Sequence, residues 1–335
     1  MVVRSLPLLL SAVSLVLVVS LALSVGSVQV APADIIRALW AGLAGKMESA
    51  GDTIIWQVRL PRVLLAGLVG GSLALAGVAY QGLFRNPLAD PYLLGVASGA
   101  GFGATLVLAL SASVPLLARL GVPLAAFAFG LATVTAVLLL ARQGRTVPLV
   151  SLILAGVVVG STLAAATSFL LLGAREQASG ILAWLLGSFA LSSWQKIGAV
   201  APLMALAATA VLLSSRALNL LQLGDDQAIQ LGLRVEVFKY GLIIAATLAT
   251  AAAVSVAGII GFVGLIVPHA VRLAFGPDHR TLVPLSLLWG ATFLVLADLL
   301  ARSVMSPSEL PVGIITALVG GPFFLYLLRS SRGLP

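Results

Sequence analysis

The chain contains no cysteine and only two histidines, His269 and His279, among its 335 residues. Disulfide bonds, thiolate metal sites and covalently attached haem are therefore excluded. Lysine is nearly as scarce, with three residues, and none of these is followed by Ser or Thr, so the phosphate-binding pattern G-x-x-x-x-G-K-[ST] is missing. These absences leave no catalytic residue, cofactor or metal site to assign. They also indicate that the chain does not hydrolyse nucleotides by itself.

Charged residues of both signs are rare, at 9% of the chain, whereas 60% of the residues are hydrophobic. A soluble chain of this length would form about two domains and would carry roughly 25% charged residues. Ten helices of about 20 residues would use roughly 200 residues, which matches the hydrophobic fraction. The composition therefore predicts an all-α integral membrane protein, with about ten transmembrane helices in a single domain over residues 1–335.

The apolar runs give the positions of ten predicted spans. They cover residues 6–28, 60–84, 92–112, 120–141, 149–173, 194–213, 238–258, 260–276, 281–303 and 310–328. The first run is longer than the core of a signal peptide and more membrane segments follow it, so we interpret it as a span. Alternating the spans from an inside N-terminus places both termini in the cytoplasm. The predicted turn between the seventh and eighth spans lies near Gly258 to Gly264.

The net charge of +8 does not indicate nucleic-acid binding, because the 19 basic residues are scattered singly among the loops. The lipid bilayer is the partner that such charges suit. Eleven of the 19 fall on the inner side of the predicted topology and eight on the outer side, which is a weak positive-inside bias. Membrane topology alone therefore does not explain the arginines on the outer side.

The inner loop of residues 214–239, here called the coupling loop, is the longest polar segment on the predicted cytoplasmic side. It contains LNLLQLGDDQAIQLGL at 218–233. Gly224 followed by Asp225 and Asp226 is typical of a helix stop and then the acidic first turn of a new helix. The residues alone leave two interpretations open, a docking surface for a cytoplasmic partner or a solvated connection.

Small residues recur at four-residue spacing, which lets helix backbones approach closely in a membrane. The span at 149–173 is rich in small and hydroxylated residues that could line a path for a bulky substrate: Gly156, Gly160, Ser161, Ala165 and Ser168. Asp298 is the one acid that we expect inside a span, and Arg302 follows four residues later on the same helical face. We expect a structural ion pair there and no proton relay. Energy for pumping would then come from another subunit.

Four motifs in register resemble one family. They are RLPRVLLAGLVGGSLALAGVAYQGLFRNPLADPYLLGVASG at 59–99, LGDDQAIQLGL at 223–233, GFVGLIVPHAVR at 261–272, and LADLLAR at 296–302 with ELPVGIITALVGGPFF at 309–324. The sequence is similar to the FecCD-type permeases of ABC importers for iron-siderophore complexes, haem and cobalamin, the large ten-span type II importers. The resemblance runs in order from the first outer loop to the C-terminus.

The resemblance implies that the chain works together with other protein subunits. In this family two permease copies form the path in the cytoplasmic (inner) membrane, most often as a homodimer. Two ATP-binding subunits, which carry the ATP and magnesium, lie beneath, and an extracytoplasmic binding protein delivers the cargo. ATP-driven alternating access is the implied mechanism. An ion-coupled secondary transporter is the alternative, and the coupling loop and the lack of a relay argue against it.

The resemblance also implies roles for particular residues. Arg59, Arg62 and Arg302 match arginines that dock the binding protein. The ATPase-coupling surface matches Leu223, Gly224, Asp225, Asp226, Ala228, Leu231 and Gly232. Two segments, here called the inner gate segments, match the closing elements of the path: Asn86, Pro87 and Leu88, and then Pro148 and Leu149. His269 matches a family histidine beside a proline, for which we expect a packing or hydrogen-bonding role in preference to haem ligation. The cargo, whether siderophore, haem or cobalamin, stays open.

Overall fold

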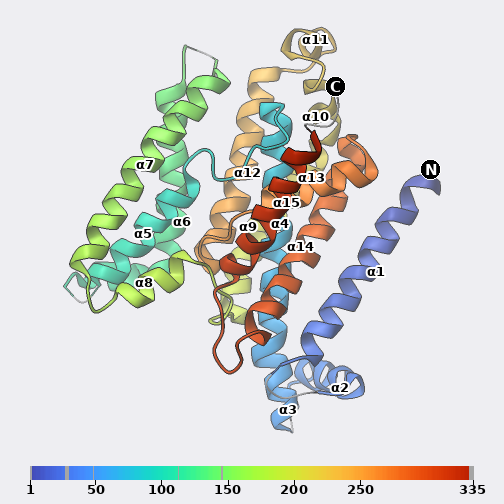
Figure 1. Ribbon diagram of the computed structural model, residues 1–335, viewed down its shortest axis with the longest axis vertical. Coiled ribbons are helices and arrows are strands. Elements are labelled where there is room, and N and C mark those ends of the chain that lie inside the picture. Colours follow the sequence, from blue (N-terminus) through green and yellow to red (C-terminus); the bar gives the residue numbers. More distant parts are fainter. Residues whose placement is uncertain (1, 27–29, 48, 112, 145, 332–335) are drawn as a thin grey trace.

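The computed structural model describes residues 2–26, 30–47, 49–111, 113–144 and 146–331, which form helices joined by turns and loops (Figure 1). Within these ranges seven helices are long and apolar enough to cross a membrane, and three more are apolar but shorter. The long helices are α1 (Val2–Ser24), α4 (Leu60–Phe84), α6 (Pro115–Ala141), α7 (Leu149–Gly173), α9 (Trp194–Leu213), α12 (Val235–Ala257) and α14 (His279–Ser303). The shorter ones are α5 (Val96–Leu110), α13 (Val263–Phe275) and the apolar segment Val312–Tyr326 of α15 (Val312–Ser331). These ten helices occupy the ten predicted spans and confirm the all-α fold.

The predicted span boundaries hold best where a span is regular throughout. The ranges 60–84, 149–173 and 194–213 coincide with α4, α7 and α9. Helix α6 instead begins at Pro115 and contains a break at Gly121, with φ 69° and ψ 155°. Pro123 follows two residues later, and proline removes a helical hydrogen bond. Glycine supplies the positive φ that the break needs.

The third span is shorter than predicted because its first residues form a loop. One carboxylate oxygen of Asp90 accepts a hydrogen bond from the backbone N–H of Tyr92 at 2.7 Å, which is an Asx-type turn. Gly95 then takes φ 78°, so α5 begins only at Val96. The loop of residues 85–95 therefore runs from the end of α4 back into the bundle, as Figure 1 shows.

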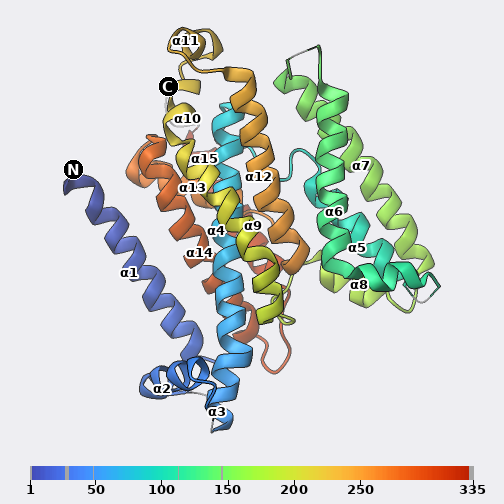
Figure 2. The same ribbon diagram turned by 180° about the vertical axis from the view of Figure 1, so that it is seen from behind.

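Helix α4 is the centre of the bundle, with α14, α12, α13 and α9 packed around it (Figures 1 and 2). Its close packing depends on glycine. A Cβ placed on Gly77 would lie 1.8 Å from the carbonyl oxygen of Gly264 in α13, which is far inside van der Waals contact. The predicted small-residue faces act in the same way, since a Cβ on Gly103 of α5 would lie 2.7 Å from the carbonyl oxygen of Ala125 in α6.

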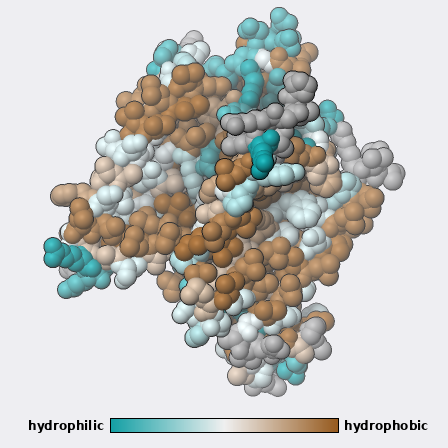
Figure 3. All heavy atoms as spheres, in the orientation of Figure 1, coloured by the Kyte–Doolittle hydropathy of each residue, from teal (hydrophilic) through white to brown (hydrophobic). Residues whose placement is uncertain are grey.

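Shorter elements lie at the two ends of the bundle. Helices α2 (Pro32–Leu43) and α3 (Ala50–Thr53) and the π-helical turn η1 (Ile54–Arg59) precede α4 at one end, here called the α2 end. Helix α8 (Ala178–Leu185) lies towards that end. Helices α10 (Ser215–Leu221) and α11 (Asp225–Gln230) form the other end, here called the α11 end. Hydrophobic residues cover much of the visible face between the two ends, and hydrophilic residues gather near α11 (Figure 3).

Candidate translocation path and coupling site

The coupling loop folds as the two short helices that its sequence predicts. Helix α10 ends before Gly224, which has φ 112°, and α11 begins with Asp225 and Asp226 in its first turn. Gly232 closes the motif with φ 87°. Residues that carry a side chain disfavour positive φ values, so the backbone at both positions requires glycine. The predicted helix stop at Gly224 is confirmed.

The exposed surface of the coupling loop is partly apolar. Leu223, Ile229 and Leu231 expose 53%, 57% and 59% of their surface at the tip of the molecule. Ala228 was expected on the same surface, but it is 0% exposed and belongs to the hydrophobic core. That expectation was wrong because Ala228 lies on the inner face of α11, where it holds the helix against the bundle. The available docking surface consists of the leucine and isoleucine side chains beside the acidic first turn.

Asp225 joins the coupling loop to two other parts of the chain through ion pairs. One carboxylate oxygen accepts a hydrogen bond from Arg85 Nη2, and the other accepts one from Lys239 Nζ at 2.6 Å. Arg85 also donates from Nε to the carbonyl oxygen of Leu221 at 2.8 Å, which fixes the end of α10. Lys239 Nζ further bonds Glu236 at 3.2 Å, and its side chain is only 6% exposed. A buried ammonium needs such partners.

The environment of Asp225 favours its charged form. Partial burial alone would raise the pKa of this carboxyl, but the hydrogen bond and charge of Lys239 and then of Arg85 outweigh it. The pKa of Asp225 is therefore lower than its ordinary value. The ion pairs of the coupling loop persist throughout the neutral pH range.

Both inner gate segments begin directly beside this ion-pair network. Arg85 ends α4 with φ 49° and precedes the segment Asn86 to Leu88, whose turn is closed by a hydrogen bond from the Leu88 N–H to Asn86 Oδ1 at 2.9 Å. Glu236 accepts a hydrogen bond from the N–H of Val147 at 3.1 Å, and Val147 precedes Pro148 and Leu149. A movement of α11 would therefore pull on the residues that adjoin both segments.

A hollow of about 370 Å³, here called the path hollow, opens between α7, α5 and the loop of residues 85–95. Three of the five predicted path residues line it together, namely Gly156, Gly160 and Ser161. Ala165 and Ser168 lie further along α7, are exposed and do not line it. A Cβ on Gly156 would lie 2.4 Å from the carbonyl oxygen of Leu93, so glycine is what allows the loop to approach α7.

The path hollow also contains polar residues that the sequence reasoning missed. Asp90 and Ser98 line it beside Gly95. The apolar runs predict Asp298 as the one acid inside a span and leave Asp90 in a connecting segment, so they do not point to this site. The pattern N-P-L-A-D-P at 86–91 is the signal that could have found it, since two prolines around an acid predict an irregular loop.

The three arginines expected to dock a partner all point into the chain. Arg62 pairs with Asp298 through Nε and Nη2, at 2.8 to 3.1 Å, and with Glu309 through Nη1 at 2.8 and 3.0 Å. Arg59 donates from Nη1 to the carbonyl oxygens of Leu23 at 2.7 Å and Ser24 at 3.1 Å. Arg59 and Arg62 expose only 4% and 8% of their surface. Their docking role stays a prediction.

Asp298 forms a structural ion pair, as expected, but its partner differs from the expected one. The carboxylate bonds Arg62 of α4, whereas Arg302 of its own helix donates from Nη2 to the carbonyl oxygen of Ala22 at the end of α1. Asp298 lies on the face of α14 that packs against α4, so the nearest cation comes from across the helix interface. Arg59 and Arg302 instead hold the last carbonyl groups of α1, which a helix end leaves without helical partners.

His269 packs where α13 meets α15. Its ring lies 6.2 Å from that of Phe323 at an interplanar angle of 82°, and 6.3 Å from that of Phe324. An edge-to-face arrangement of this kind stabilises aromatic packing. The contacts agree with the packing role that the sequence favoured.

Comparisons with known proteins show the family of the chain. The family model described as the FecCD transport family matches residues 14–330. The chain is 45% identical to the cobalamin import system permease protein BtuC of Halobacterium salinarum, over 86% of this chain and 76% of that protein. It is 43% identical to the hemin transport system permease protein HmuU of Yersinia pestis, over 83% and 84%.

A solved structure supports the same assignment at the level of the fold. An inward-facing metal-chelate type ABC transporter superposes with a TM-score of 0.83 and 34% sequence identity, over 96% of this chain and 98% of that one. These comparisons give no support to an ion-coupled secondary transporter. Permeases of this kind are transport subunits and carry out no reaction of their own. The chain belongs to the FecCD transport family and is the membrane permease of an ABC importer.

Proposed function

We propose that this permease takes up a large metal chelate, which is an iron-siderophore complex, haem or a corrinoid such as cobalamin. The relatives named for cobalamin and hemin support this class of cargo. The path hollow supports it too, because Asp90 is the one charged residue among the described residues that line it, and the rest of the lining is glycine, serine, tyrosine and aliphatic side chains. A path that must release a bulky cargo is served by weak contacts of this kind.

The ion-pair network around Asp225 is the observation on which the proposed mechanism depends. In our proposal a pair of ATP-binding subunits, which hold the ATP and magnesium, contacts Leu223, Ile229 and Leu231 at the α11 end. Closure of these subunits displaces α11, and Arg85 and Glu236 pass the displacement to the inner gate segments. The permease itself needs no cofactor for this step.

The assembly that we propose has two copies of this chain with the path between them. The α11 end and both termini lie in the cytoplasm, and the chain resides in the cytoplasmic (inner) membrane. A substrate-binding protein docks at the α2 end, where Glu309 is 39% exposed beside the buried Arg62. Arg59, Arg62 and Arg302 would contribute to docking through the shape and charge of this end.

Uptake into proteoliposomes tests the proposal. The chain is reconstituted with its candidate ATP-binding subunit and binding protein, and an iron-siderophore, haem and cobalamin are offered in parallel. We expect ATP-dependent accumulation of one of the three, and none when the ATP-binding subunit cannot hydrolyse ATP. Accumulation driven by an ion gradient without ATP would contradict the proposed mechanism, and accumulation of none of the three cargoes would contradict the proposed cargo class.

A further inference from the structure

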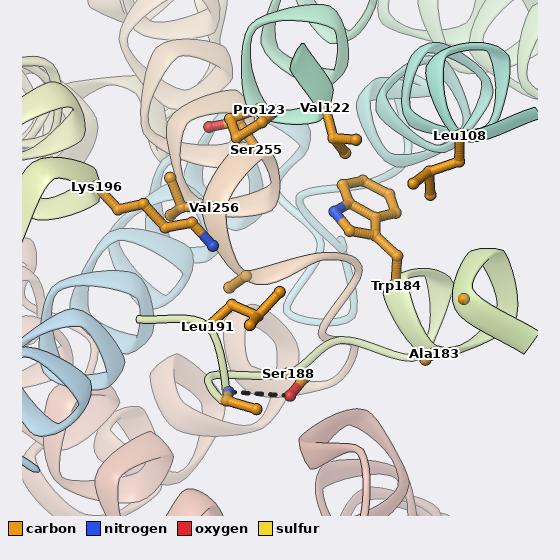
Figure 4. Close-up of a pocket in the computed structure, with 13 residues that line it drawn as sticks. Leu108, Val122, Pro123, Ala183, Trp184, Ser188, Leu191, Lys196, Ser255 and Val256 are labelled. Atoms are coloured by element: carbon orange, nitrogen blue, oxygen red, sulfur yellow. Dashed lines mark hydrogen bonds between the residues drawn. The ribbon is translucent and has the colours of Figure 1, made fainter. Parts of the chain in front are cut away.

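A second cavity, separate from the path hollow, lies on the side of the bundle formed by α9, α12 and α6. Its volume is about 560 Å³, within the range of roughly 300–1,000 Å³ that small-ligand sites usually have. Helix α8, the following loop and the kinked start of α6 complete its walls. The lining includes Leu108, Val122, Trp184, Leu191, Lys196 and Val256 (Figure 4).

The cavity is apolar apart from one cationic group and two serine hydroxyls. Lys196 belongs to the first turn of α9 and extends its ammonium group into the space, while Trp184 approaches from the opposite side (Figure 4). Within the described residues, the structure gives Lys196 Nζ no hydrogen bond and no ion pair. Ser188 accepts a hydrogen bond from the N–H of Ala190 at 3.1 Å, and Ser255 donates to Ala252.

The surroundings of the cavity have the character of a surface that faces lipid. Leu191 lines the cavity and exposes 80% of its surface, and Leu124 and Leu206 on the adjoining helices expose 53% and 64%. Four of the 20 residues of α9 are buried, namely Val200, Met204, Ala207 and Val211. Lys196 stands near the end of its helix, at the depth where lysine side chains meet lipid headgroups.

We propose that this cavity binds one anionic phospholipid, whose phosphate pairs with Lys196 and whose acyl chain lies against Trp184 and Val256. The charge of the single unpaired ammonium group selects an anionic headgroup over a zwitterionic one, because a zwitterionic lipid brings its own cation. The apolar walls accept the acyl chain by the hydrophobic effect. One lysine near a membrane surface favours an anionic lipid by about fivefold, and we expect a preference of that size here.

Trp184 provides a reporter for this site. The permease is reconstituted into nanodiscs that contain brominated phosphatidylglycerol or brominated phosphatidylcholine, and tryptophan quenching is measured. The chain has four other tryptophans, so the Trp184 contribution is the difference between the unchanged chain and Trp184→Phe. We expect the brominated phosphatidylglycerol to quench Trp184 at about one fifth of the mole fraction that phosphatidylcholine requires.

Substitutions at Lys196 separate specific binding from general lipid contact. Lys196→Gln should abolish the preference for phosphatidylglycerol, and Lys196→Arg should retain it. Lys46→Gln removes one exposed lysine at the α2 end and should leave the preference unchanged. Equal quenching by both lipids in the unchanged chain would overturn the proposal, as would a preference that survives Lys196→Gln. Preferential quenching by brominated stearate instead would reassign the site to a free carboxylate amphiphile.

Discussion

Arg62 and Asp298 form a two-pronged ion pair, with Nε and Nη2 at 2.8 to 3.1 Å from the carboxylate oxygens, although 236 residues separate them. The side chains are 10% and 3% exposed. Glu309 adds a third charge on the partly exposed side. The pair therefore ties α4 to α14 and to the loop before α15 at the α2 end.

Replacement of Arg62 by alanine should destabilise the permease by about 3–5 kcal/mol, because Asp298 would remain charged and unpaired inside the bundle. Thermal unfolding of the detergent-solubilised chain measures this loss. The double variant Arg62→Leu with Asp298→Leu should recover much of the stability, since it removes both charges. Arg280→Ala is the control and should be nearly neutral, because its side chain is 53% exposed and its partner Asp278 is 37% exposed. An Arg62→Ala chain that melts like the unchanged one would contradict a structural role.

The same variants separate stability from docking. If Arg62 acts on the binding protein only by shaping the α2 end, the double leucine variant should dock it more tightly than Arg62→Ala does. If the Arg62 guanidinium contacts the binding protein directly, both variants should lose docking alike. Binding of the candidate binding protein to reconstituted permease measures the difference.

The sequence predicted what depends on local pattern and missed what depends on packing between distant segments. Ten apolar runs were enough to place ten helices, and Gly224 before two aspartates was enough to place the turn between α10 and α11. The partner of Asp298 was predicted wrongly, because helical spacing brings Arg302 near but cannot show that Arg62 crosses from α4. The burial of Ala228 was missed for a similar reason, since a helix of six residues has too short a pattern to show its inner face.

The path residues show the same division. Gly156, Gly160 and Ser161 could be read from composition as one small, mildly polar stretch. Their contact with the loop that contains Asp90 could not be predicted. It depends on the loop continuing as far as Gly95, so that α5 begins only at Val96, and on the close approach of Leu93 to Gly156. The apolar run that predicts a span from residue 92 onward conceals the irregular backbone of residues 92–95.

Asp225→Asn should uncouple transport from ATP hydrolysis. The substitution removes the charge that holds Arg85 and Lys239, and charge-assisted hydrogen bonds of this kind contribute about 1.5–3 kcal/mol. We expect cargo uptake per ATP hydrolysed to fall about tenfold while basal ATPase activity of the assembled complex persists. Gln230→Ala is the matched control, because Gln230 is exposed on the same helix and belongs neither to the ion-pair network nor to the predicted coupling surface. Equal effects of the two substitutions would show that the ion-pair network is not the link.

The coupling loop should keep its position across the neutral pH range. Because the pKa of Asp225 is lowered in the folded chain, its contribution to holding α11 is present above the ordinary aspartate pKa and is lost as the pH falls through the lower folded value. The chain has no cysteine, so Asp226→Cys offers a single site for a spin label. Label mobility should stay constant from pH 8 to pH 5 and rise only below about pH 4.

A variant that combines Asp226→Cys with Asp225→Asn should show the mobile spectrum at every pH. This result would locate the pH response in Asp225 and not in the membrane or the label. Mobility that rises between pH 7 and pH 5 in the chain with Asp225 intact would contradict the stabilised charge.

Gly77→Ala should disturb the crossing of α4 and α13 at the centre of the bundle. The added methyl carbon would lie 1.8 Å from the carbonyl oxygen of Gly264, a backbone atom that cannot rotate away. Overpacking of this kind costs about 1–3 kcal/mol or more, because the two helices must separate. Gly198→Ala in α9 is the matched control, since a Cβ there meets no atom within 4 Å, and alanine favours the helix by up to about 1 kcal/mol. Thermal unfolding should therefore show a lower melting temperature for Gly77→Ala and an equal or higher one for Gly198→Ala; equal melting temperatures for both would mean that the α4–α13 contact is looser than the structure shows.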